Sequence, residues 1–160
     1  MRKSTILMIA VVFIASILIV GIFGMKIFTI GKVNYVKEIV VSQDSFTIDN
    51  TEAQANFKVV ESSDGSKKYS YLIIVKPNTT VNLTINPTLI PTLDDMELTN
   101  PEITTIFEHN NPENAKTTFS DGVFTMSSAV NGADSFVATL KTNDGSNLRL
   151  SITVMVVFRA

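Results

Sequence analysis

The residues best suited to chemistry in this 160-residue chain are six carboxylates and one histidine between positions 94 and 113. No Lys or Arg interrupts the acidic set, which consists of Asp94, Asp95, Glu97, Glu102, Glu108 and Glu113. Ca²⁺ takes roughly six to eight oxygen ligands from carboxylates and loop carbonyls, so Asp94, Asp95 and Glu97 are the candidate metal ligands. Their spacing matches no EF-hand. We expect a solvated acidic face here, with Ca²⁺ binding as the alternative.

The only histidine, His109, stands in the segment FEHNNPEN, whose Asn and Pro residues predict an exposed loop. A catalytic base needs a nucleophile or an orienting group beside it, and the chain has no GxSxG, HExxH, P-loop or GxGxxG spacing. The absence of Cys excludes disulfides, thiolate chemistry and Cys-based metal sites. We therefore expect a protein that is not an enzyme, with no catalytic residue, no cofactor and no small-molecule substrate.

The distribution of charge along the chain indicates which class of partner is unfavourable. From Val33 onward the chain has nine Lys or Arg and all fifteen Asp and Glu, a net charge of −6. A domain of that sign repels a phosphate backbone and offers no basic stripe. We expect that nucleic acid is not the partner.

The elements that must position these groups begin with an apolar run, residues 4–25, which has no formal charge. Twenty-two helical residues rise about 33 Å, enough for a hydrocarbon core of about 30 Å. Arg2 and Lys3 precede the run, and only Ile22 and Gly24 fit a cleavage site even loosely. The run predicts an uncleaved signal-anchor helix, with a cleaved export signal as the alternative. The side chains expected to hold it in the bilayer include Ile6, Phe13, Ile19 and Phe23.

The orientation follows from what comes after the anchor, because Lys26 and Lys32 balance Arg2 and Lys3 across it. A short N-terminus before the apolar run and a Thr-, Asn- and Asp-rich remainder favour a cytoplasmic N-terminus. The expected parts are a cytoplasmic tip and transmembrane helix (1–25), a juxtamembrane linker (26–34) and one extracytoplasmic domain (35–160). The predicted location is the cell membrane, with a single pass.

The expected domain consists of strands. Alternation of apolar and polar residues predicts strands at 79–85, 136–140 and 148–158, and an apolar run predicts another at 69–75. Further strands are expected at 36–41, 45–48, 55–60, 102–107 and 122–128. Turn signals separate them, including Asp64-Gly65, Asn86-Pro87, Ile90-Pro91 and the hairpin turn TNDGSN at 142–147. The pattern predicts an all-β fold, an antiparallel sandwich of about seven to nine strands.

The order of these features resembles the bacterial immunoglobulin-like domains of the BIG-2 type. VKEIVVSQDSFTI is similar to their opening strand pair, TTVNLTINPTLIP to a central strand ending in proline, and TNPEITTI to their Asn-Pro strand. The stretch from DGVFTM to ITVMV is similar to their Asp-Gly turn and closing hairpin. Residues 50–69 look like added material, and the Trp that often precedes the Asn-Pro segment is missing. The resemblance implies an immunoglobulin-like β-sandwich on a cell-surface protein, serving adhesion or as a spacer, with no catalytic residues.

Together these features predict a non-enzymatic, membrane-anchored module that binds or scaffolds another cell-envelope component. Its expected partners are the lipid bilayer and a protein or other envelope component. One alternative is a structural subunit of a filament or secretion assembly packed through its N-terminal helix. Another is a secreted form of the same domain after signal cleavage.

Overall fold

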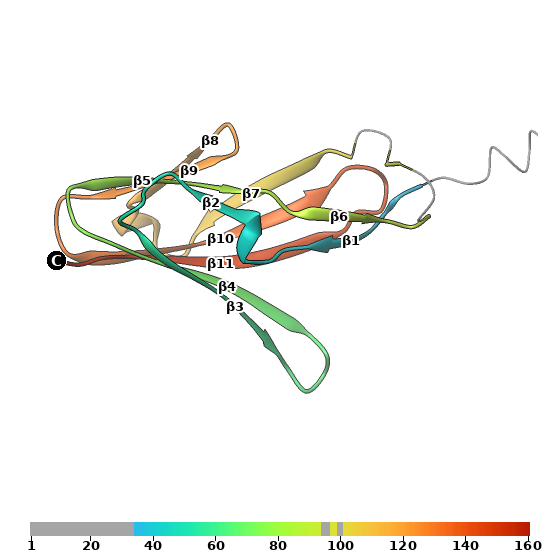
Figure 1. Ribbon diagram of the computed structural model, residues 1–160, viewed down its shortest axis with the longest axis horizontal. Coiled ribbons are helices and arrows are strands. Elements are labelled where there is room, and N and C mark those ends of the chain that lie inside the picture. The colour runs from blue at the N-terminus through green and yellow to red at the C-terminus, as the bar shows by residue number, and fades with distance from the viewer. Residues whose placement is uncertain (1–33, 94–96, 99–100) are drawn as a thin grey trace, which may run out of the picture. The chain divides into compact units, whose positions relative to one another are not determined.

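The computed structural model describes residues 34–93, 97–98 and 101–160 (Figure 1). Apart from Asn34, the described residues belong to one compact unit, Tyr35–Ala160. It is all-β, with two one-turn 3₁₀ helices, η1 (Gln43–Ser45) and η2 (Pro112–Asn114). Its strands are β1 (Val36–Val40), β2 (Phe46–Ile48), β3 (Gln54–Glu61), β4 (Lys67–Val75), β5 (Thr79–Ile85), β6 (Thr88–Pro91), β7 (Ile103–His109), β8 (Thr117–Ser120), β9 (Val123–Ser128), β10 (Gly132–Thr142) and β11 (Arg149–Phe158).

The strands form two main sheets and one short pair. The larger sheet has the order β3-β4-β11-β10-β7, and the smaller has the order β2-β5-β9-β8. Strands β1 and β6 pair separately, with Val40 opposite Thr88. All pairs are antiparallel except β4 and β11, which run parallel with Tyr69 opposite Ile152 and Val75 opposite Phe158.

The two main sheets enclose one hydrophobic core, which gives a β-sandwich-like arrangement. Side chains of a strand point alternately to its two faces. In β11 this places Ile152, Val154 and Val156 in the core with no exposed surface, while Met155 between them is 45% exposed. β10 follows the same rule, with Phe136, Ala138 and Leu140 buried. The strand alternation seen in the sequence therefore describes which side chains fill the interior.

Aromatic rings connect the two sheets across the core. Phe124 of β9 stacks on Phe136 of β10 with ring centroids 4.9 Å apart, and Phe107 of β7 contacts both of them. At another point Phe46 of β2 stacks on Tyr71 of β4 at 4.1 Å. Rings bury large apolar areas and gain additional energy from such contacts, so these pairs hold the sheets face to face.

The hairpin β3–β4 extends beyond both sheets at its far end (Figure 1). Its tip closes with the amide of Gly65 donating to the carbonyl of Ser62, and Gly65 has a φ of +80° that a side chain would disfavour. Val59 and Val60 near the tip are 42% and 45% exposed. The base of the hairpin is different, because Tyr71 there is 2% exposed.

The prediction of an all-β fold is confirmed, and several details of it are wrong. The described residues contain eleven strands rather than seven to nine, because the sequence pattern missed β6 and β8. The larger sheet is mixed rather than purely antiparallel. The Ile90-Pro91 pair, expected in a turn, ends strand β6, which has only β1 as a neighbour and so tolerates a proline. The strand predicted at 148–158 corresponds to β11, which is central in its sheet, between β4 and β10.

The expected signal-anchor, with Ile6, Phe13, Ile19 and Phe23, lies outside the described residues. Within the described part of the chain, no helix has the length and hydrophobicity that crossing a membrane requires.

Candidate functional site

Of the three residues expected as metal ligands, the structure describes only Glu97. Asp94 and Asp95 lie outside the described residues, and Glu97 is exposed. Glu102 accepts a hydrogen bond from the side-chain amide of Asn143, and Glu108 is exposed on β7 opposite Val137. Among residues 34–93, 97–98 and 101–160, no three His, Cys, Asp or Glu side chains are grouped as metal ligands would be.

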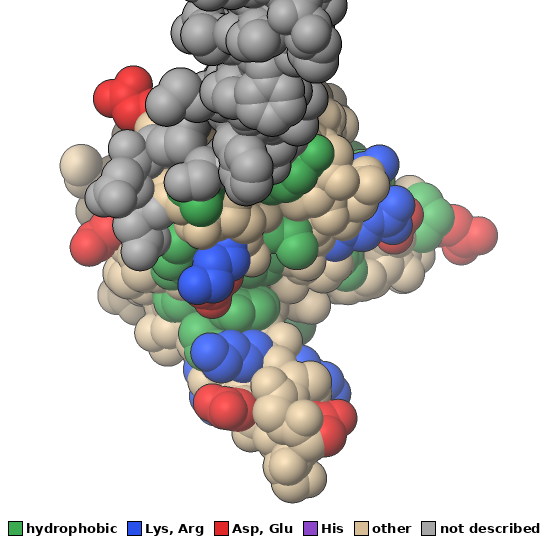
Figure 2. Space-filling model, turned by 90° about the vertical axis from the view of Figure 1, so that its right-hand side faces the viewer, with side chains coloured by type: hydrophobic (Ala, Val, Ile, Leu, Met, Phe, Trp, Pro, Cys, Tyr) green, Lys and Arg blue, Asp and Glu red, His purple; other side chains and the backbone are tan. Residues whose placement is uncertain are grey.

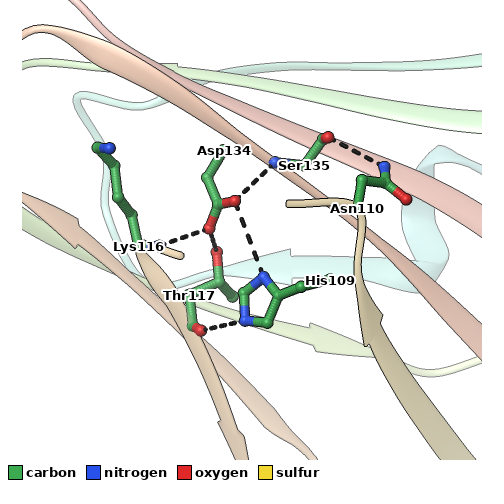
Figure 3. A network of polar contacts seen from close by, with 6 residues as sticks. All are labelled: His109, Asn110, Lys116, Thr117, Asp134 and Ser135. Carbon is green, nitrogen blue, oxygen red and sulfur yellow. Dashed lines mark hydrogen bonds and ion pairs between the residues drawn. The ribbon is translucent and has the colours of Figure 1, made fainter. Parts of the chain in front are cut away.

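The sequence predicted that His109 is in an exposed loop, and this prediction is wrong. It is the last residue of β7, and only 15% of its side chain is exposed (Figure 3). Its Nε2 atom lies 2.9 Å from the carbonyl oxygen of Thr117, and because a carbonyl only accepts, Nε2 carries the proton. The ring packs edge-on against Phe107 with centroids 4.5 Å apart.

Asp134, at the start of β10, is the centre of the polar cluster around His109 (Figure 3). One carboxylate oxygen accepts from the amide of Lys116 at 2.7 Å and from the hydroxyl of Thr117 at 2.8 Å. The other accepts from the amide of Ser135 at 2.8 Å. A carboxylate that is 2% exposed is stable only when donors replace water, and these three donors do so.

The arrangement of these groups is unlike that of a nucleophile and its base. The Thr117 hydroxyl donates to Asp134 rather than to His109, and His109 engages a carbonyl. Catalysis by a hydroxyl requires the base to take the proton from that hydroxyl. The cluster therefore joins the end of β7 and the start of β8 to β10, which is a structural role.

A groove of about 410 Å³ lies between the hairpin β3–β4, strand β1 and the start of β11. Three cations line it, one from each element: Lys37 of β1, Lys67 of β4 and Arg149 of β11. Glu38 is the only carboxylate along it, and Tyr69 contributes an aromatic ring. Figure 2 looks onto this end of the molecule and shows Lys and Arg side chains around hydrophobic ones, next to the protruding hairpin.

Among the residues that the structure describes, the three cations of the groove have no partner of opposite charge within ion-pair distance. Within the described residues, Lys76 forms an ion pair with Glu52 at 3.6 Å, and His109 lies 3.8 Å from Asp134. Lys37, Lys67 and Arg149 are each exposed and take part in neither. The groove thus concentrates unpaired positive charge in a domain whose overall sign is negative.

Sequence reasoning missed this groove. The three cations come from positions 37, 67 and 149, so no local spacing connects them. Only the pairing of β4 with β11 brings Lys67 close to Arg149. A cluster assembled by sheet topology leaves no motif in the sequence.

No family model matches the chain, and a search of the curated proteins finds no matching relative.

Proposed function

We propose that residues 35–160 are an immunoglobulin-like module that binds or scaffolds another component of the cell envelope, without catalysis, and that residues 4–25 anchor it to the cell membrane. The module lies outside the cytoplasm in this proposal. The linker of residues 26–34 keeps it near the bilayer, since nine extended residues reach only about 32 Å.

The strand order supports the immunoglobulin-like assignment. In a constant-type immunoglobulin domain, one sheet has the order A-B-E-D and the other has C-F-G. Strands β2, β5, β9 and β8 follow the first order, and β7, β10 and β11 follow the second. On this assignment the hairpin β3–β4 is inserted between the A and B strands, which agrees with the added material expected at residues 50–69.

The observation that carries the binding role is the exposed end of the hairpin. Val59 and Val60 are on a two-stranded ribbon that extends beyond the sheets, and β3 is an edge strand of its sheet (Figure 1). Edge strands of soluble domains are usually protected by charges, bulges or covering segments, and exposed apolar residues there favour contact with another molecule. Part of the edge is already covered, because Gln43 accepts a hydrogen bond from the amide of Phe57.

The anchor is supported by the length and the lack of charge of residues 4–25. Intact mass of the membrane-extracted protein tests it: retention of residues 1–24 is expected, and a soluble product beginning near Met25 would contradict it. Protease added to intact cells should degrade the domain, whereas protection of the domain would place it in the cytoplasm.

The binding role is tested by a photo-crosslinking amino acid at position 60, compared with the same group at position 121. Asp121 is in the β8–β9 turn, away from the hairpin. We expect a discrete crosslinked product in cells from position 60 and none from position 121. A ladder of copies of the chain would favour the filament subunit instead. Equal yields from both positions would contradict a binding role for the hairpin.

A further inference from the structure

The groove beside the hairpin has the composition of an anion site. With Lys37, Lys67 and Arg149 against Glu38, its lining carries a net charge of +2. Like charges that converge without a counter-ion repel one another, so the arrangement is at its most favourable when an anion lies among them. The three cations are exposed, so a ligand that binds reversibly from solvent can reach them.

The geometry of the lining favours phosphate over carboxylate. The three cations belong to three separate strands, so the groove is lined by several N–H donors on independent side chains. A phosphate has several acceptor oxygens in a tetrahedral arrangement, and Arg and Lys are its usual partners in proteins. A carboxylate has only two oxygens, both in one plane, and a single Arg can contact both of them.

The remaining lining favours a ligand with a polyol portion. Ile39, Leu148 and Leu150 line the same groove, together with half-buried Tyr69 and with Ser151. This mixed lining suits a hydroxylated carbon chain, whose C–H groups contact the apolar side chains and whose hydroxyls bond to polar ones. A volume of about 410 Å³ is in the range of small-ligand sites and takes a compact group rather than a long peptide.

We propose that Lys37, Lys67 and Arg149 bind the phosphate of a polyol phosphate, such as a glycerol phosphate group. Two sources supply this chemistry: the headgroup of an anionic phospholipid and a soluble polyol phosphate. The inference names a ligand class for the proposed binding module and rests on that function, but it does not require the crosslinking partner at Val60. Lys37 is twelve residues after Met25 in the sequence, so a bilayer that held residues 4–25 would be within about 43 Å of it.

Lysine acylation read by mass spectrometry tests the site in the full chain, reconstituted in nanodiscs of phosphatidylcholine. The probe is glycerol 1-phosphate. Lys58 and Lys76 are internal controls, since both are exposed and neither lines the groove. At about four times Kd, about one fifth of the grooves stay empty, so acylation of Lys37 and Lys67 should slow about fivefold. Acylation of the two control lysines should be unchanged.

An Arg149→Gln variant should lose most of this protection, whereas Arg159→Gln, with the same change of charge outside the groove, should keep it.

A second experiment replaces the soluble probe with nanodiscs that contain phosphatidylglycerol. Selective protection there assigns the lipid headgroup as the source, and protection by glycerol 1-phosphate alone assigns a soluble ligand. Equal slowing at all four lysines, no slowing in either experiment, or protection by hexaglutamate but by neither phosphate source would overturn the proposal. A position-60 crosslink that persists in Arg149→Gln would then show that the binding module survives the failure of this site.

Discussion

The Nδ1 atom of His109 lies 3.8 Å from the Oδ1 atom of Asp134, and this buried nitrogen has no hydrogen-bond partner among the described residues. The opposite nitrogen of the ring donates to the Thr117 carbonyl, so a neutral ring presents an acceptor to a carboxylate. The burial of this pair depends on the hydrogen-bond donors that surround Asp134.

Replacement of Asp134 by Ala should destabilise the fold by about 3 kcal/mol, because three donors lose their acceptor inside the protein. These donors are the Lys116 amide, the Thr117 hydroxyl and the Ser135 amide. Urea unfolding measures the change, and Glu113→Ala is the matched control because that carboxylate is exposed. Equal stability of the two variants would show that the cluster does not contribute to the fold.

Asp144 should stabilise the fold in a pH-dependent manner. Burial opposes ionisation, yet hydrogen bonds from Ser146 and from the Val36 amide lower its pKa from 3.8 to about 2. A lowered carboxyl pKa stabilises the folded state above the unfolded value, and this contribution is lost as the pH falls from about 4 to about 2. Asp144→Asn should therefore cost about 1 kcal/mol near pH 7, after allowance for solvent screening, and very little near pH 2.

Urea unfolding at pH 7, 4 and 2 measures that difference for Asp144→Asn and for the control Asp121→Asn, whose carboxylate is in an exposed turn. If the difference in unfolding free energy between wild type and Asp144→Asn stays constant down to pH 2, the lowered pKa of Asp144 is contradicted.

Gly145 should tolerate substitution less well than Gly122. Both have positive φ, +93° and +81°, so alanine at either costs about 1 kcal/mol in backbone strain. A Cβ at Gly145 would also lie 3.1 Å from the ring of Tyr35, whereas nothing lies within 4 Å at Gly122. We expect a lower melting temperature for Gly145→Ala than for Gly122→Ala. The reverse order would mean that the Tyr35 ring moves aside freely.

Phe124 should be among the most costly core residues to truncate. It has no exposed surface and contacts Phe107, Phe119 and Phe136. Phe124→Ala should destabilise the fold by about 3 to 5 kcal/mol, measured by urea unfolding. Val130→Ala is the surface control, since Val130 is 65% exposed and should change stability by less than about 0.5 kcal/mol.

The sequence predicted the strands whose side chains alternate, because one face of each is buried. It missed β8 (Thr117–Ser120), which is short and has a single large apolar residue, and β6, whose flanking prolines resemble turn signals. It misjudged His109 because the neighbouring Asn110, Asn111 and Pro112 are polar or turn-forming. The burial of that ring comes from Thr117 and Asp134, which are distant along the chain, and such tertiary contacts leave no local pattern.

The central place of β11 between β4 and β10 determines when this domain acquires its structure. The strand that joins the two halves of the larger sheet follows all the other described strands along the chain, and loop-closure entropy makes such distant pairing slow. Until Arg149–Phe158 arrives, the hairpin β3–β4 has no neighbour on one side and exposes both of its edges. A chain in which β11 has not yet paired would therefore expose unpaired strand edges, which favour aggregation.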